Sequence, residues 1–199
     1  MILYFDTETT GLRPGNIIQL SYILDDGKTQ KGKNFYFNAQ NVEPSATAVH
    51  GYTPQLILQL SKGKVFSDYA MEIYADFLNA KLIVGHNCNF DVAFLISEFK
   101  RLNLQFRYNE SFDTMRFFTP VLKLERSSTK MYKYPKLCEL CEFYQISEKE
   151  ISAQVKRIFG GDASTLHEAR FDTTAMYLSV QKSLKTQPKL FERLSNYLN

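Results

Sequence analysis

Two carboxylates, Asp6 and Glu8, follow directly on the apolar run Ile2–Phe5. That run has the composition of a buried strand, and side chains two residues apart on a strand share one face. Two acids projecting together from the edge of a buried sheet are costly unless a cation lies between them. Hard divalent ions such as Mg²⁺ or Mn²⁺ suit carboxylate oxygens, so the pair predicts a metal site, although acidic pairs are also common on protein surfaces.

Two further carboxylates and a histidine are candidates for the same site. Asp91 follows the short apolar strand Leu82–Val84 and stands where a helix begins, so it is either a third acid at the sheet edge or a helix N-cap. Asp172 lies near the start of the penultimate predicted helix, five residues after His167. A histidine titrates near neutral pH, as a general base for water requires, but His167 reaches Asp172 only from a preceding loop; a capping or surface role is the alternative.

The order of these motifs resembles the DEDD exonuclease family, histidine subclass. The matching segments are Asp6–Gly11, Gly85–Asp91 and His167–Asp172, with supporting likeness at Val49–Thr53 and Leu137–Cys141. Together they extend over residues 1–182. The family includes the proofreading subunit of bacterial replicative polymerase and several RNA-trimming exonucleases.

The resemblance implies a ribonuclease-H-like fold and hydrolysis of phosphodiester bonds from a 3′ end, releasing 5′-mononucleotides. Two divalent ions, Mg²⁺ or Mn²⁺, would be held by four carboxylates, with His167 as the base. Three other positions match residues that contact the terminal nucleotide. One position departs from the pattern, because Ser45 replaces a frequent glutamate. The implied metal ligands are Asp6, Glu8, Asp91 and Asp172, and the implied nucleotide contacts are Thr9, His50 and Phe90.

The polymer is less defined than the reaction. DNA is favoured over RNA, in proofreading or repair, but contacts to a 2′-hydroxyl decide this and the motifs do not reveal them. A catalytically silent domain would not need all five catalytic residues. A nuclease that cuts internally would need neither a histidine at position 167 nor the grip of Asp6–Gly11 on an end.

The charge is mildly positive overall and locally concentrated. The 199 residues carry a net charge of +3, which permits binding to a polyanion without requiring it. Within 123–136, five cations alternate with Tyr132 and Tyr134, a pattern that suits a nucleic-acid strand but also a solvated loop. These cations are Lys123, Arg126, Lys130, Lys133 and Lys136.

The surrounding pattern predicts an α/β fold. Three early strands joined by short turns indicate an antiparallel meander, and later strands alternate with helices, so we expect a mixed sheet flanked by helices with parallel later strands. The predicted strands are Ile2–Phe5, Asn16–Leu24, Lys33–Asn38, Leu82–Val84 and Phe112–Thr114; the predicted helices are Val65–Leu78, Val92–Leu102, Leu137–Tyr144 and Glu168–Leu184. Glu125–Tyr134 is expected to be the least structured segment.

We expect one exonuclease domain at 1–182 and, in the same domain, a helical tail at 183–199 interrupted at Pro188. Three cysteines fit a reducing cytoplasm, and no segment reads as a signal peptide or membrane span. Gln187, Leu190 and Phe191 resemble short peptides that dock bacterial proteins on the sliding clamp, although these residues also fit an ordinary helix face. The expected partners are therefore a nucleic-acid 3′ end and, through this tail, a polymerase or clamp.

Overall fold

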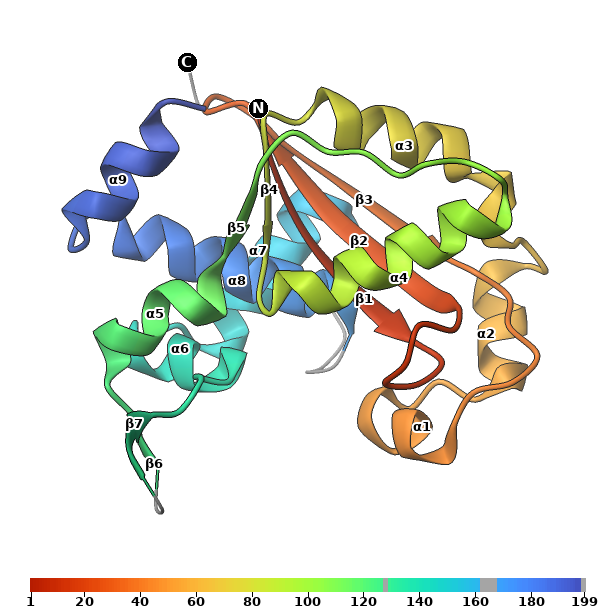
Figure 1. Ribbon diagram of the computed structural model, residues 1–199, viewed down its shortest axis with the longest axis horizontal. Coiled ribbons are helices and arrows are strands. Elements are labelled where there is room, and N and C mark those ends of the chain that lie inside the picture. Colours follow the sequence, from red (N-terminus) through yellow and green to blue (C-terminus); the bar gives the residue numbers. More distant parts are fainter. Residues whose placement is uncertain (127–128, 162–167, 198–199) are drawn as a thin grey trace.

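A five-stranded sheet organises the protein, as the computed structural model shows for residues 1–126, 129–161 and 168–197. Its strand order is β3-β2-β1-β4-β5, with β1 at the centre (Figure 1). The first three strands pair antiparallel, whereas β4 pairs parallel with β1, and β5 parallel with β4. The strands are β1 Ile2–Thr9, β2 Ile17–Asp25, β3 Gln30–Tyr36, β4 Leu82–Gly85 and β5 Ser111–Asp113. The predicted mixed α/β sheet is confirmed.

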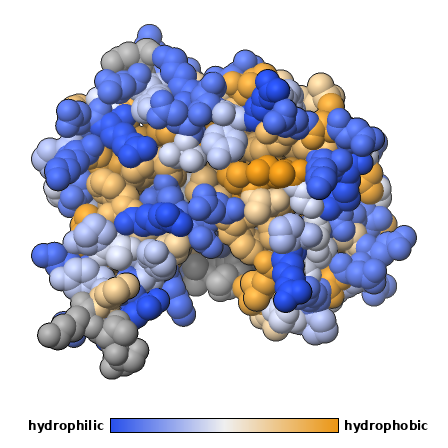
Figure 2. Space-filling view, in the orientation of Figure 1, coloured by the Kyte–Doolittle hydropathy of each residue, from blue (hydrophilic) through white to orange (hydrophobic). Residues whose placement is uncertain are grey.

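Helices cover both faces of this sheet. In Figure 1, α3 and α4 cross one face while α7 and α8 lie behind the other. Figure 2 shows the same side of the molecule in space-filling form, with hydrophilic side chains around most of its rim. Alternate β1 side chains enter two separate cores: Leu3 and Phe5 join the aromatic cluster under α3 and α4, and Ile2 and Tyr4 pack with residues of α8. Because both faces are covered, Ile2–Phe5 is apolar throughout rather than alternating.

The helices differ from prediction mainly in number. They are α1 Pro44–His50, α2 Pro54–Ser61, α3 Ala70–Asn79, α4 Cys88–Arg101, α5 Thr114–Leu122, α6 Leu137–Phe143, α7 Glu148–Phe159, α8 Ala169–Ser183 and α9 Pro188–Ser195, with a 3₁₀ turn at Phe66–Asp68. The predicted helix Val65–Leu78 is therefore wrong at its start. At this start, the Asp68 side chain accepts a hydrogen bond from the Val65 amide, and this bond closes a separate turn before α3.

The segment expected to be least structured instead contains a small hairpin. β6 (Glu125–Arg126) pairs antiparallel with β7 (Thr129–Tyr132), and the Lys133 amide extends the pairing by donating to Leu124 O at 2.8 Å. This prediction was wrong because two-residue pairing leaves almost no periodicity in the sequence.

The tail also departs from prediction, because Pro188 begins α9 instead of interrupting it. Proline is tolerated at the first helical position, where its missing N–H has no partner to lose. Leu190 and Leu194 are buried in the same cluster as Ile2 and Tyr4. A clamp-binding peptide that presents both Leu190 and Phe191 would therefore have to leave this core. Within the described residues, no helix has the length and apolar character to cross a membrane.

Leu190→Ala should lower the free energy of unfolding by about 2–5 kcal/mol, because it opens a cavity in a closed core. Phe191→Ala is the matched control: Phe191 is 57% exposed, and its loss should change the free energy by less than about 0.5 kcal/mol. Urea unfolding measures both. Equal effects of the two substitutions would contradict this packing of α9.

Candidate active site

Three carboxylates meet at the end of the central strand. Asp6 and Glu8 lie on one face of β1, and Asp172 reaches them from the first turn of α8, which packs against β1. One oxygen from each of these three side chains lies within 4.8 Å of the others. An all-carboxylate set of hard oxygen donors fits Mg²⁺ or Mn²⁺ and offers no soft ligand. The residues present therefore suit the implied metal.

Asp91 stands beside this cluster on the other face of β1. It lies in the first turn of α4 and is 3% exposed. Its Oδ1 accepts hydrogen bonds from Thr7 Oγ1 at 2.6 Å and from the Thr7 amide at 3.2 Å. The N-cap position of α4 belongs to Asn87, so the alternative role of Asp91 as the N-cap is wrong.

Burial and mutual repulsion disfavour ionisation of these acids. Desolvation is the largest cause raising the pKa of Asp6 well above its usual range, followed by the charges of Asp91, Asp172 and Glu8. Desolvation and the charge of Asp172 raise the pKa of Glu8 in the same way. Burial raises the pKa of Asp91 to about 7, against the lowering effect of its hydrogen bonds from Thr7. A divalent cation among these oxygens would offset both penalties.

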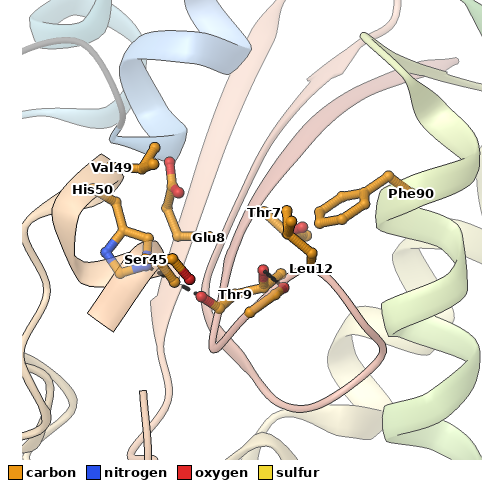
Figure 3. A pocket seen from close by; sticks show the side chains of 10 residues that line it. Thr7, Glu8, Thr9, Leu12, Ser45, Val49, His50 and Phe90 are labelled. Atoms are coloured by element: carbon orange, nitrogen blue, oxygen red, sulfur yellow. Dashed lines mark hydrogen bonds between the residues drawn. The ribbon is translucent and has the colours of Figure 1, made fainter. Parts of the chain in front are cut away.

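A cavity of about 290 Å³ opens next to the acids. Its lining residues are Thr7, Glu8, Thr9, Gly11, Leu12, Ser45, Ala46, Val49, His50 and Phe90. In Figure 3, Phe90 approaches from α4 while Val49 and His50 stand on the opposite side, with Glu8 between them. Thr9, His50 and Phe90, the three positions expected to contact a nucleotide, therefore line one pocket that shares Glu8 with the carboxylate cluster.

His50 holds one wall of the pocket in place. The Tyr52 amide donates to its Nδ1 at 3.0 Å, which requires that nitrogen to be an acceptor. The proton of the neutral ring therefore lies on Nε2, which donates to Thr9 O at 3.1 Å, the bond drawn dashed in Figure 3. Both ring nitrogens are thus engaged in joining α1 to the end of β1, and the ring itself forms the wall.

Ser45 occupies the position where a glutamate was expected from the family pattern. A neighbouring acid, Glu43, places its carboxylate against Gly11: a Cβ built on Gly11 would lie 2.3 Å from Glu43 Oε1. The Glu43 amide also donates to Thr10 O at 2.8 Å. Glycine at position 11 thus allows an acid to approach the loop that lines the pocket.

A buried polar network behind Glu8 escaped the sequence interpretation. Gln19, which pairs with Glu8 across β1 and β2, is fully buried. Its Nε2 donates a hydrogen bond to Glu168 Oε1 at 2.5 Å. Its Oε1 accepts hydrogen bonds from the Ala169 amide at 3.1 Å and from the Tyr52 hydroxyl at 3.0 Å. A lone amide in the apolar run of β2 was the available signal for this network.

This network fixes the start of α8. Glu168 Oε1 also accepts from Arg170 Nε at 2.6 Å, so a buried acid is neutralised where the helix begins. Ala169 is held through its backbone, and Asp172 follows within the same turn. His167, the predicted base, lies outside the described residues; it is joined to this fixed point by one peptide bond.

Comparisons with known proteins agree with this architecture. A family model described as exonuclease matches residues 3–177. DNA polymerase III subunit epsilon of Pasteurella multocida is 30% identical over 152 residues, which cover 70% of this chain and 56% of that protein. The structure of exonuclease I superposes with a TM-score of 0.74 at 20% identity, covering 98% of this chain and 43% of that one. Exonuclease X in complex with 5′ overhanging duplex DNA superposes over the full length of both chains, with a TM-score of 0.67 at 18% identity.

The chain belongs to this exonuclease family, and the resemblance seen in its motifs is confirmed. Its sheet and flanking helices are the ribonuclease-H-like fold of the solved exonucleases. The chain spans a little over half the length of the P. multocida relative.

Stability of the metal-free protein should fall as pH rises from about 4 to about 7. Over this window the folded state keeps a proton on Asp91 that the unfolded chain has lost, so each added pH unit favours unfolding. Asp91→Asn keeps an acceptor for Thr7 but removes the titration. In thermal unfolding measured in EDTA, the unfolding temperature of the variant should therefore rise relative to that of the native protein as pH increases. A constant difference across that window would contradict this coupling.

Gln19→Leu should lower the free energy of unfolding by about 1–3 kcal/mol or more, because it leaves buried groups around Glu168 without their partner. Gln59→Leu makes the same chemical change at an exposed position of α2 and should alter stability by less than about 0.5 kcal/mol. Urea unfolding compares them. A Gln19 variant as stable as the control would show that the network does not hold α8.

Proposed function

We propose that the protein is a two-metal-ion 3′→5′ exonuclease that hydrolyses DNA and releases 5′-mononucleotides. One observation carries the proposal: the cluster of Asp6, Glu8 and Asp172 shares Glu8 with a pocket sized for a small ligand and walled by Phe90 and His50. Chemistry and recognition of a terminal nucleotide would thus meet at one side chain.

The site residues would have two roles, metal binding and proton transfer. When bound, divalent cations supply Lewis-acid stabilisation of negative charge on the attacking and leaving oxygens. Asp6, Glu8 and Asp172 would hold them, with Asp91 completing the set from α4. His167 would accept the proton of the attacking water, a role that suits a side chain titrating near neutrality.

The pocket supports action at an end of the strand. Phe90 offers a ring to the terminal base or sugar, and Thr9 stands where β1 gives way to the loop. Leu12, 80% exposed, stands at the rim of the same pocket. The reacting phosphate would be the 5′ phosphate of the nucleotide held here, which joins it to the rest of the strand. Cleavage there with a 3′-terminal nucleotide in the pocket gives the 3′→5′ direction and a 5′-mononucleotide.

DNA is the proposed polymer because of what the related proteins bind or belong to. The P. multocida relative is a DNA polymerase III subunit, and exonuclease X was solved with duplex DNA. The same likeness supports the proposal that this protein acts beside a polymerase in the cytoplasm. A clamp contact through Gln187, Leu190 and Phe191 would require α9 to detach, because Leu190 is fully buried.

Purified protein with Mg²⁺ or Mn²⁺ should shorten 5′-labelled single-stranded DNA one nucleotide at a time, and EDTA should abolish this. Asp6→Ala should reduce the rate below detection. His167→Ala should reduce it roughly 10²- to 10⁴-fold, as loss of a general base does, while metal binding persists. Asp68→Ala is the control, an acid of the 3₁₀ turn before α3.

Side-by-side digestion of single-stranded DNA, mismatched duplex DNA and RNA separates the substrates. Faster digestion of RNA than of either DNA would overturn the proposed polymer while leaving the mechanism. Cleavage of closed circular DNA, or full activity in EDTA, would overturn the mechanism itself.

A further inference from the structure

Positive charge is concentrated in one short part of the chain. Residues 123–136 contain five cations and one acid, Glu125, and so carry a net charge of +4. The whole chain carries only +3, so the remainder is slightly negative. An attractive field for a polyanion therefore originates in this segment rather than over the surface as a whole.

The same segment exposes aromatic rings. Tyr132, the last residue of β7, is 43% exposed, and Tyr134 is 53% exposed. Arg126 and Lys136 are exposed as well, whereas Lys133 forms an ion pair with Glu139 at the start of α6. We call residues 123–126 and 131–136 the basic arm. Two exposed rings in one positively charged arm suit a ligand that has both flat faces and negative charges.

The base of the basic arm is tied to the edge of the sheet that carries the acids. His86 follows β4 and precedes Asp91 by five residues; its Nε2 bonds Pro135 O at 2.9 Å and its Nδ1 bonds Thr114 Oγ1 at 2.9 Å. Figure 1 shows the β6–β7 hairpin and α1 projecting on opposite sides of the edge where β1 ends.

We propose that the basic arm is a second contact for single-stranded nucleic acid, which holds nucleotides 5′ to the one in the pocket. Arg126 and Lys136 pair with phosphates, and Tyr132 and Tyr134 stack on bases. This rests on the proposed exonuclease function, because the strand must run out of the pocket past the acids. The arm then supplies the positive charge that the acidic site lacks.

Steady-state digestion of two 5′-labelled substrates tests the arm, one a DNA of 30 nucleotides and one a trinucleotide that occupies only the pocket and its nearest neighbours. Tyr132→Ala/Tyr134→Ala should raise KM for the long DNA roughly tenfold, within the range that stacking of a base on a ring provides. The kcat should stay within about twofold, and trinucleotide turnover should not change. Tyr132→Phe/Tyr134→Phe keeps both rings and should restore the native KM, which separates stacking from a folding defect.

Arg126→Gln/Lys136→Gln tests the phosphate contacts against a matched control, Lys28→Gln/Lys31→Gln. Lys28 lies in the β2–β3 turn and Lys31 near the start of β3, the strand at the opposite edge of the sheet from β5. Binding of the 30-nucleotide DNA is measured by fluorescence anisotropy in EDTA at several salt concentrations. Loss of two phosphate contacts should reduce the slope of log affinity against log salt by about 1.4 in the arm variant alone, at about 0.7 for each contact with a single strand.

The possible results distinguish failure of the basic-arm proposal from failure of the exonuclease proposal. If the native protein digests both substrates and the arm variants keep the native KM and salt slope, the arm proposal is wrong and the exonuclease proposal stands. Equal losses in the arm and control pairs would also overturn it, because they would report net charge alone. If the native protein digests neither substrate, the proposed function fails, and an unchanged salt slope in the arm variant would still refute the arm.

Discussion

Four acids brought to one end of a buried strand repel one another, and this repulsion shapes the surrounding structure. Desolvation and neighbouring charge both push the pKa values of Asp6 and Glu8 upward, so the folded chain opposes ionisation where ionised oxygens are needed to bind a cation. The packing of β1 between two helical layers supplies the stability that holds these groups together. A cation that removes the repulsion is therefore coupled to folding as well as to chemistry.

Successive side chains of β1 point to opposite faces of the sheet and contact different helices. Asp6 and Glu8 meet Asp172 from α8, whereas Thr7 faces α4 and donates to Asp91. On the face that meets α8, Gln19 from the neighbouring strand β2 anchors the first residues of α8. The same network reaches Tyr52, whose amide orients His50 at the pocket wall. The start of α8 and the pocket beside Glu8 are thus joined through a chain of hydrogen bonds as well as through the acids.

Sequence reasoning succeeded where local periodicity carries the information. The two-residue spacing of Asp6 and Glu8 placed them on one face because strand geometry is regular, and the apolar run before them identified the central strand. Gln19 and Glu168 were missed because their contact joins residues 149 apart, and only the fold brings them together. The β6–β7 hairpin was missed because its pairing is too short to leave a pattern. Pro188 was misread as a break because proline ends a helix in one position and begins it in another.

We propose that the carboxylates at the end of β1 form a binding site for two divalent ions. Calorimetric titration of Mn²⁺ into metal-free protein, in the presence of a 5′-mononucleotide, tests it most directly. We expect two bound ions per chain, with loss of at least one in Asp172→Asn. Binding of no ions, or the same two ions in native protein and in Asp6→Asn and Asp172→Asn alike, would contradict it.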